Sequence, residues 1–153
     1  MSRAFEDFPV GTRLVSSSRA LTAKEITDFA REFDPQQLHV DKAAPNDNLL
    51  AGHAASGWQT AAVSMRLFVE TMQVAGGIVG LAVDRLRWPH PVRPGDELRV
   101  EIKILRARLS QSRPGYGIIR YRCLTKNQKD EVVQSFLAAA MLPARSSVQP
   151  PAP

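Results

Sequence analysis

An aspartate and a histidine with complementary chemistry lie close together in the first half of the chain. Asp34 is followed by Pro35, and His39 comes five residues after Asp34. A carboxylate beside an imidazole can act as base and acid on one bound molecule, and loops on a rigid scaffold are favoured places for such groups. Taken alone, the two residues are explained more simply as a turn aspartate and a surface histidine, because loop Asp and Pro usually serve turns.

A second candidate site is the small-residue segment 50–60, which includes Ser56-Gly57-Trp58. If Ser56 begins a helix, its hydroxyl is expected to accept the N–H of Gln59. The N–H groups of Gly57 and Trp58 would then be free at the positive end of the helix dipole. Such groups can stabilise a carbonyl oxygen that gains negative charge. Gly57 would let a substrate approach the backbone closely, or it would simply let the helix pack against a neighbour.

The elements next to these two segments have helical patterns. Thr22 and Glu25 form a capping-box pair, and apolar residues follow at helical spacing. This helix should end near Phe33, because the residue before a proline is disfavoured in a helix. His39 would therefore lie on non-helical chain. A second helix should begin after Ser56, with apolar residues on most of its sides, which is typical of a buried helix.

The remaining chain alternates as β-strands do. Residues 11–21 should form an opening strand, and four further strands are expected at 77–88, 97–105, 116–125 and 131–142. The alternation breaks at Ile104-Leu105, which predicts a bulge. Because no helix separates the last four strands, successive strands should pair antiparallel. An antiparallel sheet wrapped around a largely apolar helix buries both elements, so we expect an α+β domain.

Length and composition fit one domain with its own core. The chain has 153 residues, of which 44% are hydrophobic, and domains commonly contain ~100–200 residues. Residues 1–143 should form that domain, and the Ser- and Pro-rich tail 144–153 should be disordered. The sequence has no run of ~18 apolar residues and no signal-peptide pattern at its start, so we expect a cytoplasmic protein that does not associate with membranes.

Metal and disulfide chemistry have little support in the sequence. Cys123 is the only cysteine, which excludes an internal disulfide and a cysteine-built metal site. His39, His53 and His90 lie in unrelated segments, whereas metal-binding sets normally have ordered spacing. We therefore expect no metal site.

Charge is distributed unevenly along the chain. Residues 1–76 hold seven Lys and Arg against nine Asp and Glu, and residues 77–153 hold thirteen against six. This asymmetry favours an anionic partner near the second half. The sequence has no zinc finger, no basic helix and no aromatic RNA-binding signature, so we do not expect nucleic acid to be that partner. A small phosphate-bearing ligand, or solubility alone, explains the excess equally well.

Together these segments resemble the MaoC-like dehydratase family of acyl-CoA hydratases. The family hallmark is an Asp-x-Asn-Pro-x-His segment after a short helix, followed by a small-residue loop that opens the central helix of a hot-dog fold. This sequence keeps Asp34 and His39 at the hallmark spacing, with Gln36 and Gln37 in place of the family's Asn and Pro. The resemblance extends to about Pro143 through Ser56-Gly57-Trp58, Met65-Arg66-Leu67, residues 91–96 (PVRPGD) and Asn127-Gln128.

The resemblance implies a hot-dog fold, in which an antiparallel sheet wraps around a long central helix. It also implies an enzyme that reversibly hydrates trans-2-enoyl-CoA to (R)-3-hydroxyacyl-CoA. Asp34 and His39 would hold one water between them and supply the base and the acid. The N–H of Gly57 would stabilise the thioester oxygen, with Ser56 and Trp58 beside it. The reaction needs no cofactor other than the coenzyme A of the substrate.

Two further expectations concern binding. Arg85, Arg87 and Arg93 are candidates to contact the phosphates of coenzyme A, although solvation on a strand face is the simpler explanation for any single arginine. Hot-dog sheets expose an edge that commonly pairs with a second copy. Because unpaired edges favour association, we expect a homodimer or a dimer of dimers.

Two other functions fit parts of the pattern. A hot-dog acyl-CoA thioesterase would use an acid or Asn on the central helix, but that helix offers only Glu70, near its far end. A non-catalytic acyl-CoA-binding partner is the second alternative, with Gln36 and Gln37 as marks of lost activity. The presence of both Asp34 and His39 argues against the binding partner, and we rank the thioesterase second.

Overall fold

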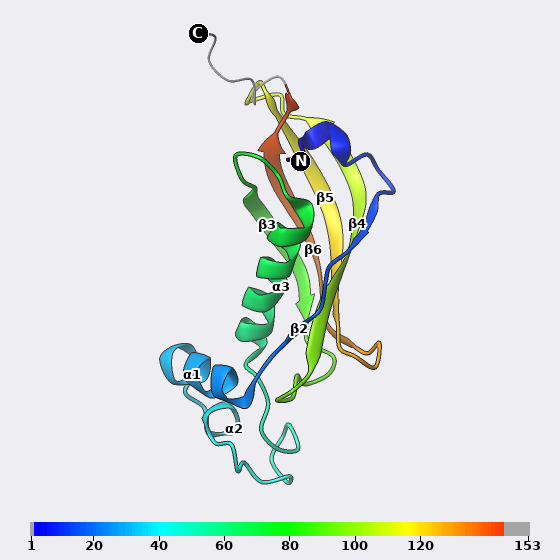
Figure 1. Ribbon diagram of the computed structural model, residues 1–153. Helices are drawn as coiled ribbons and strands as arrows, with labels where there is room; N and C mark the ends of the chain where they lie inside the picture. The colour runs from blue at the N-terminus through cyan, green and yellow to red at the C-terminus, as the bar shows by residue number, and fades with distance from the viewer. Residues whose placement is uncertain (1, 146–153) are drawn as a thin grey trace.

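The computed structural model describes residues 2–145, in which two helices at one end lead into a third helix and a curved sheet (Figure 1). After a 3-10 turn at Phe5–Asp7, the helices and strands follow in this order: β1 (Arg13–Val15), β2 (Arg19–Ala20), α1 (Ala23–Phe33), α2 (Gln37–Val40), α3 (Gly57–Met72), β3 (Val79–Arg87), β4 (Glu97–Leu109), β5 (Tyr116–Lys126) and β6 (Val132–Pro143).

All strand pairs are antiparallel, and the sheet order is β1-β4-β5-β6-β3, with β2 also on β4. The predicted pairing of successive strands holds for β4–β5–β6 but is wrong for β3, which pairs with β6. Strands lie roughly 4.8 Å apart, so the connection 88–96 is long enough to cross to the far side of the sheet. The bulge predicted at Ile104-Leu105 is confirmed as a register shift between Ile104 and Arg106.

The expected opening strand 11–21 is divided into β1 and β2. Between them, the backbone N–H of Ser16 donates to Val100 O, and the Ser16 hydroxyl accepts the N–H of Val100 at 2.8 Å. A serine hydroxyl that takes a ladder hydrogen bond competes with regular pairing. The chain therefore leaves the ladder at this point and rejoins β4 at Arg19.

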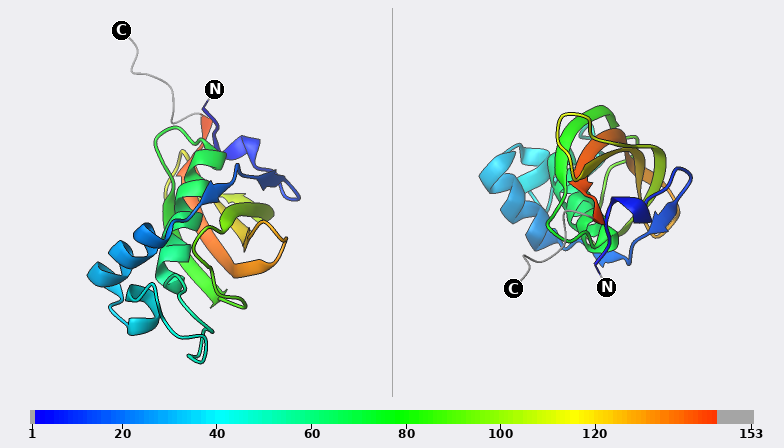
Figure 2. Two further views of the ribbon diagram at one scale, coloured as in Figure 1. Left: turned by 60° about the horizontal axis from the view of Figure 1, so that its bottom comes forward. Right: turned by 90° about the horizontal axis from the view of Figure 1, so that it is seen from above.

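The sheet curves around α3, which lies along its inner face (Figure 2). Val63, Leu67, Phe68 and Met72 are buried on the side of α3 that faces the sheet, and the Phe68 ring stacks on Tyr121 with centroids 4.7 Å apart. The expectation that α3 is buried on most sides is wrong for its other face, where Trp58, Met65 and Val69 are exposed. The α+β hot-dog architecture is confirmed.

The chain ends of the described region meet at one end of the sheet. Ala144 is buried and its N–H donates to Gly115 O, and Arg145 pairs with Asp7. The expected disorder of the tail therefore does not apply to residues 144–145, and residues 146–153 lie outside the described residues. Within residues 2–145, no helix is long and apolar enough to cross a membrane.

Candidate active site

The two predicted dyad residues lie on either side of a helix break. The capping box of Thr22 and Glu25 begins α1 as predicted, and Asp34 ends it with its N–H bonded to Ala30 O at 2.9 Å. After Pro35 the chain forms the single helical turn α2, which carries His39. The expectation that His39 lies on non-helical chain is therefore wrong, because the proline stops α1 without preventing a new turn from starting behind it.

Asp34 and His39 face each other across a short gap. The Nε2 atom of His39 lies 3.4 Å from Oδ2 of Asp34, and both side chains are largely shielded from solvent. The other ring nitrogen, Nδ1, lies 2.7 Å from the carbonyl oxygen of Ala54. Because a carbonyl only accepts, Nδ1 must carry a hydrogen, and in the neutral ring Nε2 presents a lone pair to the carboxylate. A donor with two hydrogens, such as water, can bond to both acceptors.

Two side chains hold Asp34 in its charged form. Gln36 donates to Oδ1 and Ser56 donates to Oδ2, both at 2.7 Å. The Gln36 hydrogen bond is the main reason why the pKa of Asp34 is lowered, the Ser56 bond and the charge of His39 lower it further, and burial opposes them. Gln36, which replaces the family's Asn, therefore braces the carboxylate directly.

The start of α3 differs in detail from the prediction. Ser56 caps the helix, but its hydroxyl accepts the N–H of Trp58 at 3.3 Å instead of that of Gln59. The reason is that Gln59 is held elsewhere, with its side-chain amide donating to Glu25 O and its N–H to Ser56 O. The N–H of Trp58 is therefore occupied. Across residues 2–145, no acceptor bonds to the N–H of Gly57.

A residue that the sequence reasoning missed, Trp88, packs against Gly57. A Cβ atom added to Gly57 would lie 2.6 Å from Cε2 of Trp88, so the indole covers the side that a substrate was expected to approach. The ring is fixed because its Nε1 donates to the fully buried Gln134 at 2.8 Å, and Trp58 meets it edge to face at 5.3 Å. The absence of a Cβ atom at Gly57 therefore allows close packing against Trp88 and does not open a path for a substrate on that side.

A pocket of about 480 Å³ brings the predicted residues together. Its lining includes all five of them: Asp34, His39, Ser56, Gly57 and Trp58. Apolar and aromatic residues from the β3–β4 connection and from β6 form much of the wall: Trp88, Pro89, Pro91, Val92 and Val133. The remaining lining residues are Leu49, Leu50, Ala55, Thr60 and His90. Such a mixture of apolar walls and a few convergent polar groups is typical of a small-molecule site.

Arg93 has a different role from the expected phosphate contact. Its guanidinium donates to His53 O at 3.2 Å and to Leu50 O, while its own N–H donates to Asp96 at 2.8 Å. It thereby ties down the loop that supplies the Ala54 carbonyl to His39. His53 bonds through Nε2 to the carbonyl of His39 at 2.7 Å and supports the same turn.

The other two candidate arginines lie away from the dyad. Arg85 and Arg87 are exposed on β3 and line a separate hollow with Arg122. In the described part of the chain, no three His, Cys, Asp or Glu side chains come together as a metal-binding group.

Comparisons with known proteins identify the family to which the chain belongs. A family model described as a MaoC like domain matches residues 6–126. The uncharacterized protein YdeM of Bacillus subtilis is 32% identical over 126 residues, which cover 82% of this chain and 88% of that protein. The crystal structure of the MaoC-like dehydratase from Rhodospirillum rubrum superposes with a TM-score of 0.88 at 43% identity, covering 94% of this chain and 99% of that one.

The fold extends to a more distant enzyme. The unliganded R-hydratase PhaJ1 from Pseudomonas aeruginosa superposes with a TM-score of 0.75 at 21% identity, covering 93% of this chain and 86% of that chain. From the match to the family model and the 43% identity, the chain belongs to the MaoC-like dehydratase family.

Proposed function

We propose that the protein is a hydratase that adds water reversibly to a trans-2-enoyl-CoA and forms (R)-3-hydroxyacyl-CoA. The observation that carries the proposal is the pair of acceptors, His39 Nε2 and Asp34 Oδ2, that face each other at 3.4 Å inside a pocket. Gly57 also lines this pocket, and its N–H has no acceptor within residues 2–145. The R-hydratase named above, which shares the fold, supports this reaction class.

In the proposed mechanism, one water donates a hydrogen bond to His39 and another to Asp34. As the water oxygen bonds to C3, its proton moves to Nε2 of His39, and the C2=C3 electron pair shifts toward the thioester to form an enolate. The N–H of Gly57 stabilises the enolate oxygen, a type of interaction worth roughly 3–4 kcal/mol. The imidazolium, stabilised by Asp34, then returns the proton to C2, so that one water is added and both residues are regenerated.

The mechanism requires no cofactor apart from the coenzyme A of the substrate. We also propose a cytoplasmic location, because CoA thioesters are metabolites of the cell interior.

We further propose that two copies associate through β3. Within the described chain this strand pairs only with β6, and Val79, Leu81 and Val83 on it are exposed. Met65 and Val69 on α3 are also exposed. An unpaired strand edge with exposed apolar residues favours association with a second copy.

Incubation with crotonyl-CoA tests the proposed reaction. Hydration removes the absorbance of the conjugated enoyl thioester without releasing free thiol, and chiral analysis of the product should give the R isomer. Release of thiol would instead identify a thioesterase, the second-ranked function. That alternative is weakened because Glu70, the acid on α3, pairs with Arg66 at 2.8 Å and does not line the pocket. Absence of both changes would contradict catalysis on this substrate class.

A further inference from the structure

The face of the sheet that points away from α3 places cations directly opposite one another. Arg106 is the cross-strand partner of Arg120, and Lys103 is the partner of Arg122. Arg13 on β1 lies opposite Lys103 and extends that row. Like charges at directly opposite positions destabilise a sheet. A bound anion would relieve this repulsion.

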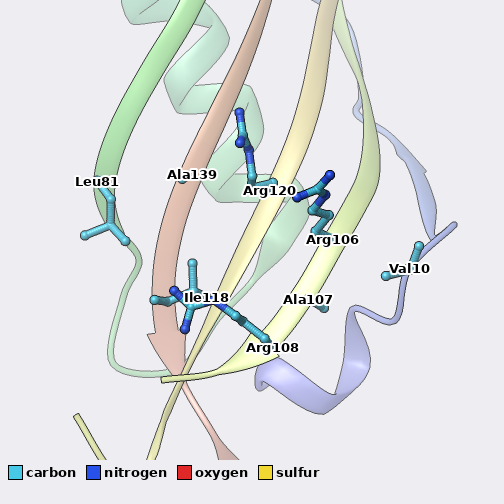
Figure 3. A pocket seen from close by; sticks show the side chains of 8 residues that line it. All are labelled: Val10, Leu81, Arg106, Ala107, Arg108, Ile118, Arg120 and Ala139. Carbon is cyan, nitrogen blue, oxygen red and sulfur yellow. The ribbon is translucent and has the colours of Figure 1, made fainter. Parts of the chain in front are cut away.

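Part of this face is hollowed into a pocket of about 520 Å³ (Figure 3). Three guanidinium side chains line it, those of Arg106, Arg108 and Arg120. The other lining residues are all apolar: Val10, Leu81, Ala107, Ile118 and Ala139. No carboxylate lines the pocket, and it shares no lining residue with the pocket that contains Asp34 and His39.

Few carboxylates of the described chain lie close enough to neutralise the arginines of this pocket. A guanidinium nitrogen of Arg120 lies 3.5 Å from Oδ2 of Asp84, and both side chains are about half exposed. Such a solvent-exposed ion pair contributes little to stability, so it neutralises Arg120 only weakly. For Arg106 and Arg108, residues 2–145 offer no carboxylate within ion-pair distance. The opposite end of the same face is different, because Glu101 there pairs with both Arg99 and Lys126. Within residues 2–145, cations without a carboxylate at ion-pair distance therefore line the pocket and continue along the face to Lys103 and Arg122.

We propose that this pocket binds an organic diphosphate, with the phosphates held by Arg106, Arg108 and Arg120 and the organic group against the apolar floor. The planar guanidinium matches phosphate oxygens geometrically and keeps its charge at all physiological pH values. Three permanent cations around one pocket match a multivalent anion better than a single carboxylate. A floor of aliphatic side chains next to them matches a ligand that carries an apolar or ring-shaped body.

Isothermal titration calorimetry tests this site with three probes: ADP, geranyl diphosphate and inorganic pyrophosphate. We expect at least one organic diphosphate to bind more tightly than pyrophosphate, and the tighter of the two identifies a nucleoside or an isoprenoid body. Arg106→Thr and Arg120→Thr should each weaken that binding about tenfold, because each removes a charge-assisted contact. Threonine is chosen because it suits a strand, and thermal unfolding will verify that both variants are folded.

The matched control is Arg31→Ala, which removes one exposed cation from α1. It should change the affinity less than twofold. Three results would overturn the proposal: no saturable binding of any probe, pyrophosphate binding as tightly as both organic diphosphates, or an equal loss of affinity in Arg31→Ala. Crotonyl-CoA hydration is measured separately and should be unchanged in all three variants, so failure of this site and failure of the hydratase assignment are distinguishable.

Discussion

The indole of Trp88 occupies the space that any side chain at Gly57 would need. A Cβ at position 57 would lie 2.6 Å from Cε2 and 2.7 Å from Cδ2 of the indole. The ring cannot move aside freely, because Gln134 holds its Nε1 and is itself bonded to Ser64 at 3.1 Å. The start of α3 and the end of β3 are therefore fitted to each other beside the proposed catalytic pair.

Gly57→Ala should destabilise the protein by about 1–3 kcal/mol, which is typical of an extra group forced into a packed site. The better helix propensity of alanine offsets at most about 1 kcal/mol of this cost. Urea unfolding of the variant and the wild-type protein measures the difference.

The Trp88→Ala background provides the control for this prediction. With the indole removed, Gly57→Ala should cost nothing or stabilise the helix, so the two substitutions should show strong coupling in a double-mutant cycle. An equal cost of Gly57→Ala in both backgrounds would show that the indole is not the cause.

Local patterns predicted the elements that hold the site. The capping box of Thr22 and Glu25, the proline after Asp34 and the apolar periodicity after Ser56 each act over a few residues. The helix α1 begins and ends, and α3 begins, where these signals place them. The bulge near Ile104 was also predicted correctly, because a break in the alternation of polar and apolar residues is visible within a few residues of the sequence.

The helical turn α2 at His39 was a local feature that the sequence reasoning missed, and the other main errors concern contacts between distant parts of the chain. The β3–β6 pairing depends on how the whole sheet wraps around α3, which no local pattern records. Trp88 was missed because its partners, Gly57 and Gln134, are far away in sequence. The only sequence feature that could have drawn attention to Trp88 is its place at the end of a predicted strand, directly before a proline. The backbone contacts of Arg93 were not foreseen, because an arginine donates to backbone carbonyls as readily as to phosphates and its sequence position does not distinguish them.

The lowered pKa of Asp34 makes a prediction about stability and pH. Its carboxyl stays ionised in the folded protein at pH values where the unfolded chain, with an ordinary pKa of 3.8, takes up a proton. The resulting stabilisation is present above the unfolded pKa and is lost as pH falls through the folded pKa. The difference in unfolding free energy between wild type and Asp34→Asn should be constant above about pH 5 and shrink below about pH 4. Urea unfolding across this range measures it, and a difference that grows on acidification would contradict the assigned hydrogen bonds.

Arg93→Met should lower kcat by on the order of tenfold while KM for crotonyl-CoA changes little. The substitution leaves the carbonyls of Leu50 and His53 without their donor, at a cost of roughly 1–3 kcal/mol per buried group, and loosens the loop that orients His39. The Nδ1 proton of His39, observed by proton NMR, should exchange faster in the variant, and Arg93→Lys should restore part of kcat. A raised KM with unchanged kcat would instead indicate a role in binding coenzyme A.

Val83→Lys should disrupt the proposed association through β3. Val83 is 59% exposed on that edge strand, and a charge there would be buried without a partner between two copies. Sedimentation velocity should therefore give a dimer for wild type and a monomer for Val83→Lys. Val15→Lys is the matched control, because Val15 is 60% exposed on β1 at the opposite edge. A wild-type protein that is monomeric at micromolar concentration would contradict the proposal.

The turnover of crotonyl-CoA by Asp34→Asn and His39→Ala tests the central claim most directly. Each substitution removes one of the two acceptors proposed to hold the water, and general acid–base groups typically contribute about 10²–10⁴-fold in rate. We expect kcat to fall by at least about 10²-fold in each folded variant, and the double variant to be little worse than either, because the residues act as a unit. Asp41→Asn, a nearby carboxylate outside the pocket lining, should retain wild-type kcat. Wild-type kcat in either folded dyad variant would contradict the proposed hydration mechanism.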